Sequence, residues 1–283
     1  EERFNRECIE AYALKHQVCP FEMGLDMSLF ADAVIGDYNY LFDPHVYLKR
    51  FFGENSSGNY IFLVDEAHNL LERGREMYSA TLVKEEFLQL KRSLQDGAKE
   101  TGRSVLYQQG FANIMIKQLE KCNKAMLGMK KECEEYRIVT DIDTLTEPVK
   151  RLQATMKGYL EETEEGEVTV KEELLELYFK VNHFLEMYEL LNDKYVKYTQ
   201  LREDGAFLVK LFCVDPSTNL KECMQKGRSS ILFSATFLPI QYYKSLLGGE
   251  EKDYEVYANS VFNPKKRALL VAGDVTSKYT RRS

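Results

Sequence analysis

The sequence nearly lacks strand signals from about Val83 to about Arg202, and strand-like runs lie on both sides of this stretch. Within it, apolar side chains recur at alternating spacings of three and four, which is the repeat of one helix face. Two such series predict long helices that pack against one another at a shallow angle. The first series is Met115, Leu119, Cys122, Met126, Met129, Cys133 and Tyr136, and the second is Leu174, Leu177, Val181, Phe184, Tyr188, Leu191, Tyr195 and Tyr198.

The flanking segments have the composition of strands that are buried on both faces, as in a parallel sheet. They comprise residues 60–64 (YIFLV), 206–216 (AFLVKLFCVDP) and 229–237 (SSILFSATF), a short run over Ala33, Val34 and Ile35, and the start of another strand from 268. A helix is expected over residues 1–18, and Pro20 is expected to end it. The predicted fold class is therefore α/β, with a partial parallel sheet interrupted by a long, all-helical insertion.

Composition limits the classes of protein that the chain can belong to. The net charge of −7 argues against a broadly basic surface that coats nucleic acid, although a local basic groove remains compatible with it. No apolar run approaches the ~20 residues of a membrane-spanning helix, so no membrane partner is expected. The start of the chain shows no secretory signal.

The metal-binding residue types are scattered along the chain. The six cysteines form no C-x-x-C pair, which favours a reducing, cytoplasmic compartment. The four histidines, at positions 16, 45, 68 and 183, are also far apart in the sequence and predict no zinc site.

Two adjacent carboxylates and a histidine, Asp65-Glu66-Ala67-His68, follow directly on the apolar run 60–64. Open parallel sheets bind ligands at the carboxyl ends of their strands. A carboxylate there can hold Mg²⁺ on nucleotide phosphates, and a second one can polarise the attacking water. The other interpretation is a surface turn with incidental charge.

A second polar segment, Ser234-Ala235-Thr236, also follows a predicted buried strand. Its hydroxyl groups would lie at the same edge of the sheet as the carboxylates. Taken alone, such a segment is more often a simple turn or helix cap. Its occurrence in the same inferred sheet as Asp65 and Glu66 favours a shared site.

These motifs resemble a known family. VDEAH and SATF are similar to motifs II and III of superfamily-two helicases, and VCPFEMGLDMSLFADAVIGDYNYLFDP, residues 18–44, resembles the DinG/XPD branch. In that branch this segment joins the iron–sulfur domain to the first motor domain, which has a RecA-like sheet. The long helical insertion is similar to the branch's Arch domain.

The resemblance implies roles for particular residues. Asp65 would bind Mg²⁺, Glu66 would activate the hydrolytic water, and His68 with Ser234, Ala235 and Thr236 would couple the state of ATP to the grip on DNA. Cys19 would be one of four thiolate ligands of a [4Fe–4S] cluster, and Tyr38, Asn39 and Tyr40 would lie near the DNA path. Two core tyrosines are the alternative interpretation of that last stretch.

The resemblance also implies a domain organisation. Residues 1–82 would hold the end of the iron–sulfur region and part of the first motor domain, and 83–205 the Arch-like insertion. Residues 206–260 would return to the first motor domain, and 261–283 would begin the second.

The sequence departs from the family pattern in two ways. No G-x-x-x-x-G-K-[ST] motif occurs, and four clustered thiolates are missing. We therefore expect an internal fragment of an ATP-dependent 5′-to-3′ DNA helicase. The fragment alone is expected to be inactive and to lack a complete cluster.

Several alternatives remain open at the level of sequence. The expected partners are single-stranded DNA or DNA junctions in the cytoplasm, near the nucleoid, with a protein partner docked on the helical insertion. Alternatively, the helical region is a DNA-guiding or protein-docking module without catalytic activity. A nuclease or phosphatase is disfavoured, because no second acidic cluster follows a predicted strand.

Overall fold

The computed structural model describes residues 5–53, 58–100, 106–162, 171–259 and 261–268. The chain divides into two compact units, Glu1–Gly249 and Glu250–Ser283. In the second unit, the described part contains one short 3₁₀ helix, η2 (Pro264–Lys266). The strand expected from 268 onward lies outside the described residues.

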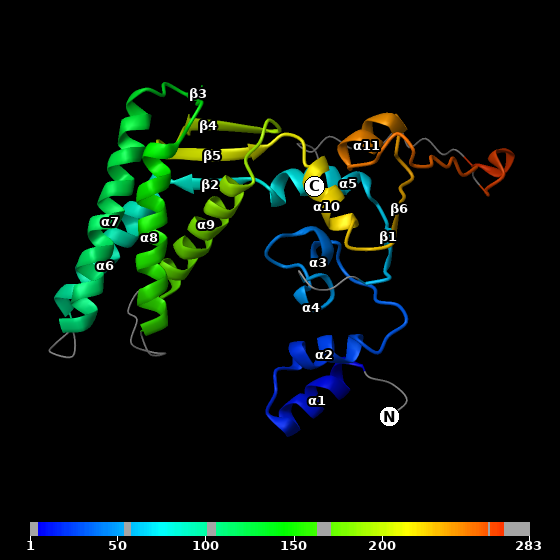
Figure 1. Cartoon of the computed structure of the whole chain (residues 1–283), viewed down its shortest axis with the longest axis horizontal. Helices are drawn as coiled ribbons and strands as arrows, with labels where there is room; N and C mark the ends of the chain where they lie inside the picture. The colour runs from blue at the N-terminus through cyan, green and yellow to red at the C-terminus, as the bar shows by residue number, and fades with distance from the viewer. Residues whose placement is uncertain (1–4, 54–57, 101–105, 163–170, 260, 269–283) are drawn as a thin grey trace. The chain divides into compact units, whose positions relative to one another are not determined.

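A parallel pair of strands carries the two predicted motifs. β1 (Ile61–Val64) pairs with β6 (Ser229–Leu232), with Val64 opposite Leu232 (Figure 1). Helix α5 (His68–Met77) follows β1, whereas α10 (Ser217–Met224) precedes β6 and α11 (Ile240–Leu246) follows it. The predicted α/β class with a parallel sheet is therefore confirmed.

A second sheet corrects the expectation of an all-helical insertion. Its antiparallel strand order is β2-β5-β4-β3, and its strands are β2 (Ala80–Val83), β5 (Phe207–Cys213), β4 (Tyr195–Leu201) and β3 (Tyr136–Ile138). The strand predicted over 206–216 thus pairs with β2 and β4 and not with the parallel strands. Tyr195 and Tyr198 fit the helical spacing only by coincidence. They lie in β4, whose β-branched and aromatic residues favour a strand.

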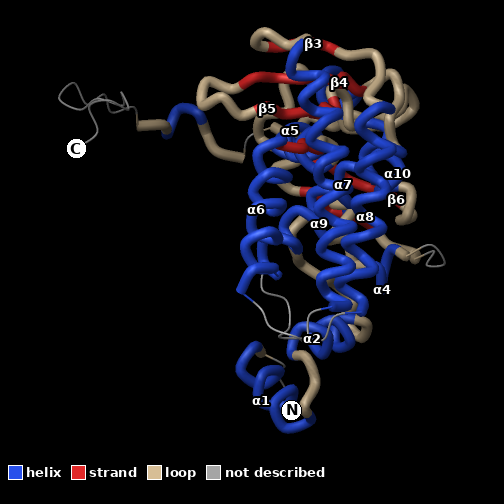
Figure 2. Tube along the Cα trace, turned by 90° about the vertical axis from the view of Figure 1, so that its left-hand side faces the viewer, coloured by secondary structure: helices blue, strands red, loops and turns tan. Residues whose placement is uncertain are grey.

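Four long helices hold most of the other described residues between β2 and β5. They are α6 (Lys84–Glu100), α7 (Leu106–Lys131), α8 (Asp143–Glu162) and α9 (Lys171–Glu189), and each packs along the next (Figure 2). The predicted seams are confirmed within the helices. Met115, Leu119, Cys122 and Met126 are buried in α7, and Leu174, Leu177, Val181 and Phe184 are buried in α9.

The N-terminal segment differs from the sequence-based expectation. α1 (Arg6–His16) ends at Gln17, which has a left-handed φ of 53°. Pro20 then begins α2 (Pro20–Ser28), because proline is well suited to the first turn of a helix. Two single-turn helices, α3 (Asn39–Phe42) and α4 (Lys49–Phe52), follow.

The buried strand predicted over Ala33–Ile35 is wrong. These residues form no regular element, and the side chain of Ile35 is fully exposed. An apolar run of three residues is too short to distinguish a strand from an exposed loop, because strands usually need four or more residues.

The core beneath the parallel strands joins α5 to its neighbours. Ala67, Leu70 and Leu71 are buried there, and the Tyr78 hydroxyl donates a hydrogen bond of 2.7 Å to the Phe42 carbonyl. None of the described helices is both long and apolar enough to cross a membrane.

Candidate functional site

The two predicted motifs meet at the carboxyl ends of β1 and β6. Beyond the paired strands, the Phe233 amide donates to the Val64 carbonyl at 3.0 Å, and the Ala67 amide donates to the Phe233 carbonyl at 3.1 Å. These bonds extend the ladder as far as the turn that carries the carboxylates. The prediction that both motifs follow neighbouring parallel strands is therefore confirmed.

A tight turn presents the two carboxylates to solvent. Glu66 has a φ of 46°, a left-handed conformation that costs a non-glycine residue on the order of 1 kcal/mol or more. The Asp65 side chain stabilises the turn, because its Oδ1 accepts a 2.7 Å bond from the Glu66 amide. Both side chains are exposed, whereas Ala67 is fully buried and anchors the turn.

His68 links the acidic turn to the hydroxyl segment. Its Nδ1 lies 2.8 Å from Ser234 Oγ and 3.2 Å from Glu66 Oε2. The ring is about one-third exposed, so solvent reaches the contact. One imidazole nitrogen is thus shared between a carboxylate and a hydroxyl from two different strand ends.

The hydroxyl segment forms a local turn in addition to this contact. Ser234 Oγ accepts from the Thr236 amide at 3.1 Å and lies 3.2 Å from Thr236 Oγ1, while Ala235 is exposed between them. The turn expected of such a segment is therefore present. It also orients the Ser234 hydroxyl toward His68, so a polar chain runs from Glu66 through His68 and Ser234 to Thr236.

Tyr38, Asn39 and Tyr40 lie at α3 and are half-buried. Tyr38 packs against the hydrophobic core, and the backbone amide of Asn39 donates to Asp37 Oδ1. The Tyr40 carbonyl accepts from the Leu48 amide. These contacts fit the structural interpretation of the tyrosines, and a role beside DNA stays a prediction.

The described cysteines do not fit a four-thiolate cluster. Cys19 is exposed at the start of α2 and Cys8 is half-buried, whereas Cys122, Cys133, Cys213 and Cys223 are buried. Burial raises the pKa of the Cys122 thiol to about 12 and that of Cys213 to about 11, so both stay protonated and poor ligands. Cys19 belongs to no potential metal-binding group among the residues that the structure describes.

The donor set at the β1 end does fit Mg²⁺. This ion commonly binds one or two protein carboxylates together with water and nucleotide phosphates, and Asp65 and Glu66 offer exposed carboxylates. Asp65 would hold the ion, which supplies charge neutralisation to the phosphates when it is bound.

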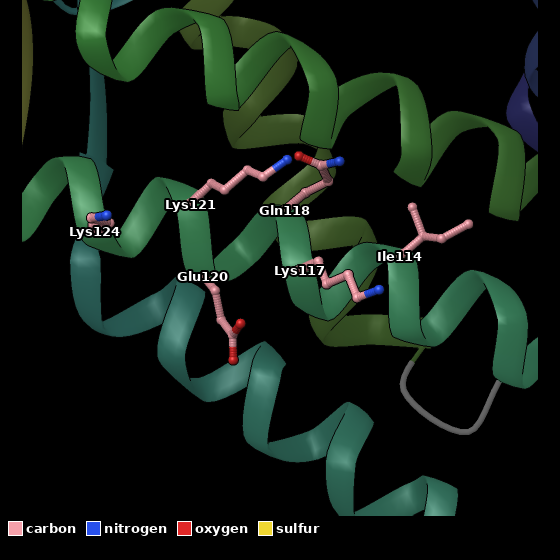
Figure 3. A pocket seen from close by; sticks show the side chains of 6 residues that line it. All are labelled: Ile114, Lys117, Gln118, Glu120, Lys121 and Lys124. Carbon is pink, nitrogen blue, oxygen red and sulfur yellow. The ribbon is translucent and has the colours of Figure 1, made fainter.

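A shallow hollow on α7 offers a second polar surface. It is lined by Ile114, Lys117, Gln118, Glu120, Lys121 and Lys124, and its lysines come from successive turns of the helix (Figure 3). Glu120 pairs with Lys91 at 2.7 Å, so that carboxylate is already neutralised by a fourth lysine. The hollow is therefore locally basic on a chain whose net charge is −7.

The structure also brings together residues that sequence analysis separated. His45, His183 and Glu186 place one potential ligand atom each within 4.8 Å of one another, although the histidines are far apart in the sequence. Only the i, i+3 spacing of His183 and Glu186 on one helix was visible in the sequence. His45 lies 138 positions before His183, so its approach depends on the fold.

Comparisons with known proteins found similarity to a protein family, to one relative and to one solved structure. Residues 1–87 match the DEAD_2 family. The helicase subunit XPD of the general transcription and DNA repair factor IIH of Dictyostelium discoideum is 37% identical over 67 residues, which are 24% of this chain and 8% of that protein. The structure of S. tokodaii Xpd4 aligns with 70% of this chain and 39% of its own, at 14% identity and a TM-score of 0.40.

This chain therefore spans only a small part of the proteins that it matches. The family match covers the segment that contains α1 to α5, β1 and the Asp65–His68 turn. Over its first 87 residues the chain is thus similar to the DEAD_2 family, and a 67-residue stretch of it is similar to an XPD helicase subunit.

Proposed function

We propose that the ends of β1 and β6 form the ATP-facing edge of a DNA helicase motor, part of which this chain supplies. The observation that carries the proposal is the contact of His68 with both Glu66 and Ser234 across two parallel strands. The match of residues 1–87 to a helicase family supports it. The motor would use ATP hydrolysis to move along single-stranded DNA in the 5′-to-3′ direction.

Each residue of the site has a distinct proposed task. Asp65 binds Mg²⁺, and Glu66 orients a water molecule and accepts its proton. His68 responds to the position of Glu66 because its Nδ1 lies within reach of that carboxylate, and it passes the change to Ser234 and Thr236. The 229–236 segment would thereby couple the state of the nucleotide to DNA binding.

The domain limits are part of the proposal. Residues 1–82 and 206–260 would belong to the first motor domain, 83–205 to the insertion and 261–283 to the second motor domain. The pairing of β2 with β5 revises two of these limits: both strands join the insertion, which then runs from about residue 80 to about residue 213. The chain alone should not hydrolyse ATP at a useful rate, because its sequence holds no G-x-x-x-x-G-K-[ST] motif.

The decisive experiment replaces Glu66 in the longest gene product that contains this chain. Glu66→Gln should lower the DNA-stimulated rate of ATP hydrolysis by about 10²–10⁴-fold, since a general base contributes that much, while ATP binding persists. Glu72→Gln is the matched control, because Glu72 is an exposed carboxylate on α5 that pairs with Arg75. Equal hydrolysis by the two variants would refute a catalytic role for Glu66.

The lysine-lined hollow supports a second candidate function, in which the helical region guides single-stranded DNA without catalysis. This alternative predicts that Glu66→Gln has no effect on ATP hydrolysis. It also predicts that the chain binds single-stranded DNA and that this binding weakens as the salt concentration rises, which a salt titration of DNA binding measures.

A further inference from the structure

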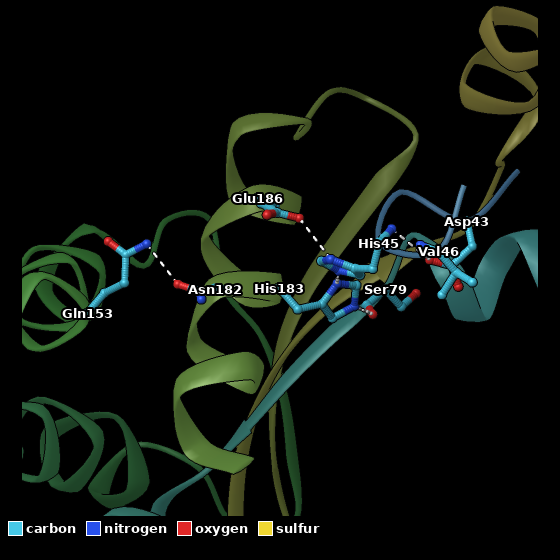
Figure 4. A network of polar contacts seen from close by, with 8 residues as sticks. All are labelled: Asp43, His45, Val46, Ser79, Gln153, Asn182, His183 and Glu186. Atoms are coloured by element: carbon cyan, nitrogen blue, oxygen red, sulfur yellow. Dashed lines mark hydrogen bonds and ion pairs between the residues drawn. The ribbon is translucent and has the colours of Figure 1, made fainter. Parts of the chain in front are cut away.

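A cluster of two imidazoles and a carboxylate connects the loop after α3 to α9 (Figure 4). His45 Nε2 lies 2.5 Å from His183 Nδ1, and His45 Nδ1 lies 3.4 Å from Glu186 Oε2. His183 and Glu186 share one face of α9 because they are three residues apart. The cluster thus brings together side chains from two elements that are far apart in the sequence.

The remaining nitrogen of His183 determines which ring atom faces the cluster. His183 Nε2 lies 2.8 Å from the Ser79 carbonyl oxygen, which can only accept, so this nitrogen carries the proton. Nδ1 therefore presents a lone pair to His45 Nε2. A histidine that ligates a metal usually donates its other N–H to a carbonyl or carboxylate in this way.

Neighbouring hydrogen bonds hold His45 and the Ser79 carbonyl in place. Asp43 Oδ1 accepts from the amides of His45 at 2.8 Å and Val46 at 3.2 Å, which fixes the turn that carries His45. Ser79 Oγ donates to the Arg75 carbonyl at 2.6 Å and accepts from the Cys213 amide at 2.9 Å, so the carbonyl behind His183 is anchored. The cluster therefore has a second layer of polar support.

We propose that His45, His183 and Glu186 bind a divalent transition metal ion of the zinc class. Two imidazole nitrogens and one carboxylate oxygen are a common zinc donor set, and they leave one position for water. Zn–N bonds of about 2.0–2.1 Å in a tetrahedron separate the two nitrogens by about 3.3 Å. The two nitrogens thus need to part by less than an ångström from their present contact of 2.5 Å. The Glu186 carboxylate, which now lies beside His45 Nδ1, also needs to turn toward the ion between the two rings.

The bound ion would link the loop over residues 43–48 to α9. This loop follows α3 and leads into α4, whereas α9 belongs to the helical region between β2 and β5. A metal bridge between them would fix the helical region against the segment that leads to β1. The site is separate from the Mg²⁺ position proposed at Asp65, because it shares none of its residues.

The test uses the chain after removal of metals with a chelator. Zn²⁺ is titrated against a chromophoric competitor, and X-ray absorption at the zinc edge identifies the ligand atoms. We expect one tightly bound equivalent with nitrogen and oxygen ligands, an imidazole scattering pattern and no sulfur. The melting temperature should rise with free Zn²⁺, because the ion binds only the folded state.

Two variants and two controls make the result specific. His45→Ala and Glu186→Gln change half-exposed side chains, so both should fold, lose the tight equivalent and lose the thermal shift. His16→Ala on α1 and Cys19→Ser should keep both, because neither residue belongs to the cluster. Equal uptake by the wild type and His45→Ala, sulfur ligation, or no tight equivalent would each overturn the proposal.

Discussion

At the scale of single residues, Asp215 joins the end of β5 to the start of α10. Its Oδ1 accepts from the Ser217 amide at 2.9 Å, and its Oδ2 lies 3.2 Å from Lys194 Nζ. Burial alone would raise the pKa of this carboxyl group. The bonds from Ser217 and Lys194 outweigh that effect and hold the pKa below the ordinary value of 3.8.

This pKa shift predicts a loss of stability in acid. Because the folded pKa is the lower one, the stabilisation is complete above about pH 3.8 and disappears as the pH falls through the folded pKa. Asp215→Asn should lower the free energy of unfolding at pH 7 by about 1 kcal/mol and flatten its dependence on pH in that acid range.

Urea unfolding at a series of pH values measures both effects. Asp193→Asn, an exposed carboxyl in the neighbouring loop, is the control and should follow the wild type. If the free energy of unfolding of the wild type and of Asp215→Asn fell equally as the pH is lowered, this carboxyl group would not contribute to the loss of stability in acid.

Some residues of the sites were predictable from the sequence and others were not. The positions of Asp65, Glu66, Ser234 and Thr236 followed from two apolar runs that end in polar residues, because strand ends of one parallel sheet lie together. His45 carries no such local signal. Its partner lies 138 positions away, and the turn capped by Asp43 decides where its ring points.

At the scale of elements, Gly74 permits the close packing of α5 against α10. A Cβ atom at this position would lie 3.1 Å from Pro216 Cβ and 3.4 Å from Leu220 Cδ1. Gly74→Leu should therefore destabilise the chain by about 1–3 kcal/mol through overpacking, although leucine favours a helix.

The same substitution at Gly128 on α7 is a matched control. A Cβ atom there meets no neighbour within 4 Å, and the position is exposed. Gly128→Leu should be stabilising by roughly 0.5–1 kcal/mol through helix propensity. Thermal unfolding of the two variants measures the difference, and equal melting temperatures would contradict the packing of α5 on α10.

The elements also show where periodicity is ambiguous. Spacings of three and four correctly predicted the buried faces of α7 and α9, since Cys122 and Val181 lie in the core. The same spacing continued through Tyr195 and Tyr198, which form part of β4. Over seven residues, a helical repeat and a strand alternation share several positions, so the flanking tertiary contacts decide the outcome.

At the scale of the whole chain, the central feature is that the polypeptide returns after a long excursion and pairs β6 with β1, its first strand. His68 and Ser234 are 166 positions apart, and all four strands of the antiparallel sheet and four long helices lie between them in the sequence. The chain nevertheless pairs β6 beside β1, residue by residue from Ile61 opposite Ser229. The proposed motor edge exists only if this closure occurs.

A double-mutant cycle on His68 and Ser234 tests that closure most directly. The free energies of unfolding of the wild type, His68→Ala, Ser234→Ala and the double variant are measured by urea titration. A contact between the 2.8 Å partners predicts a coupling free energy of about 0.5–3 kcal/mol. Strictly additive effects would mean that the acidic turn and the hydroxyl segment are not adjacent, and they would contradict the motor edge proposed at the ends of β1 and β6.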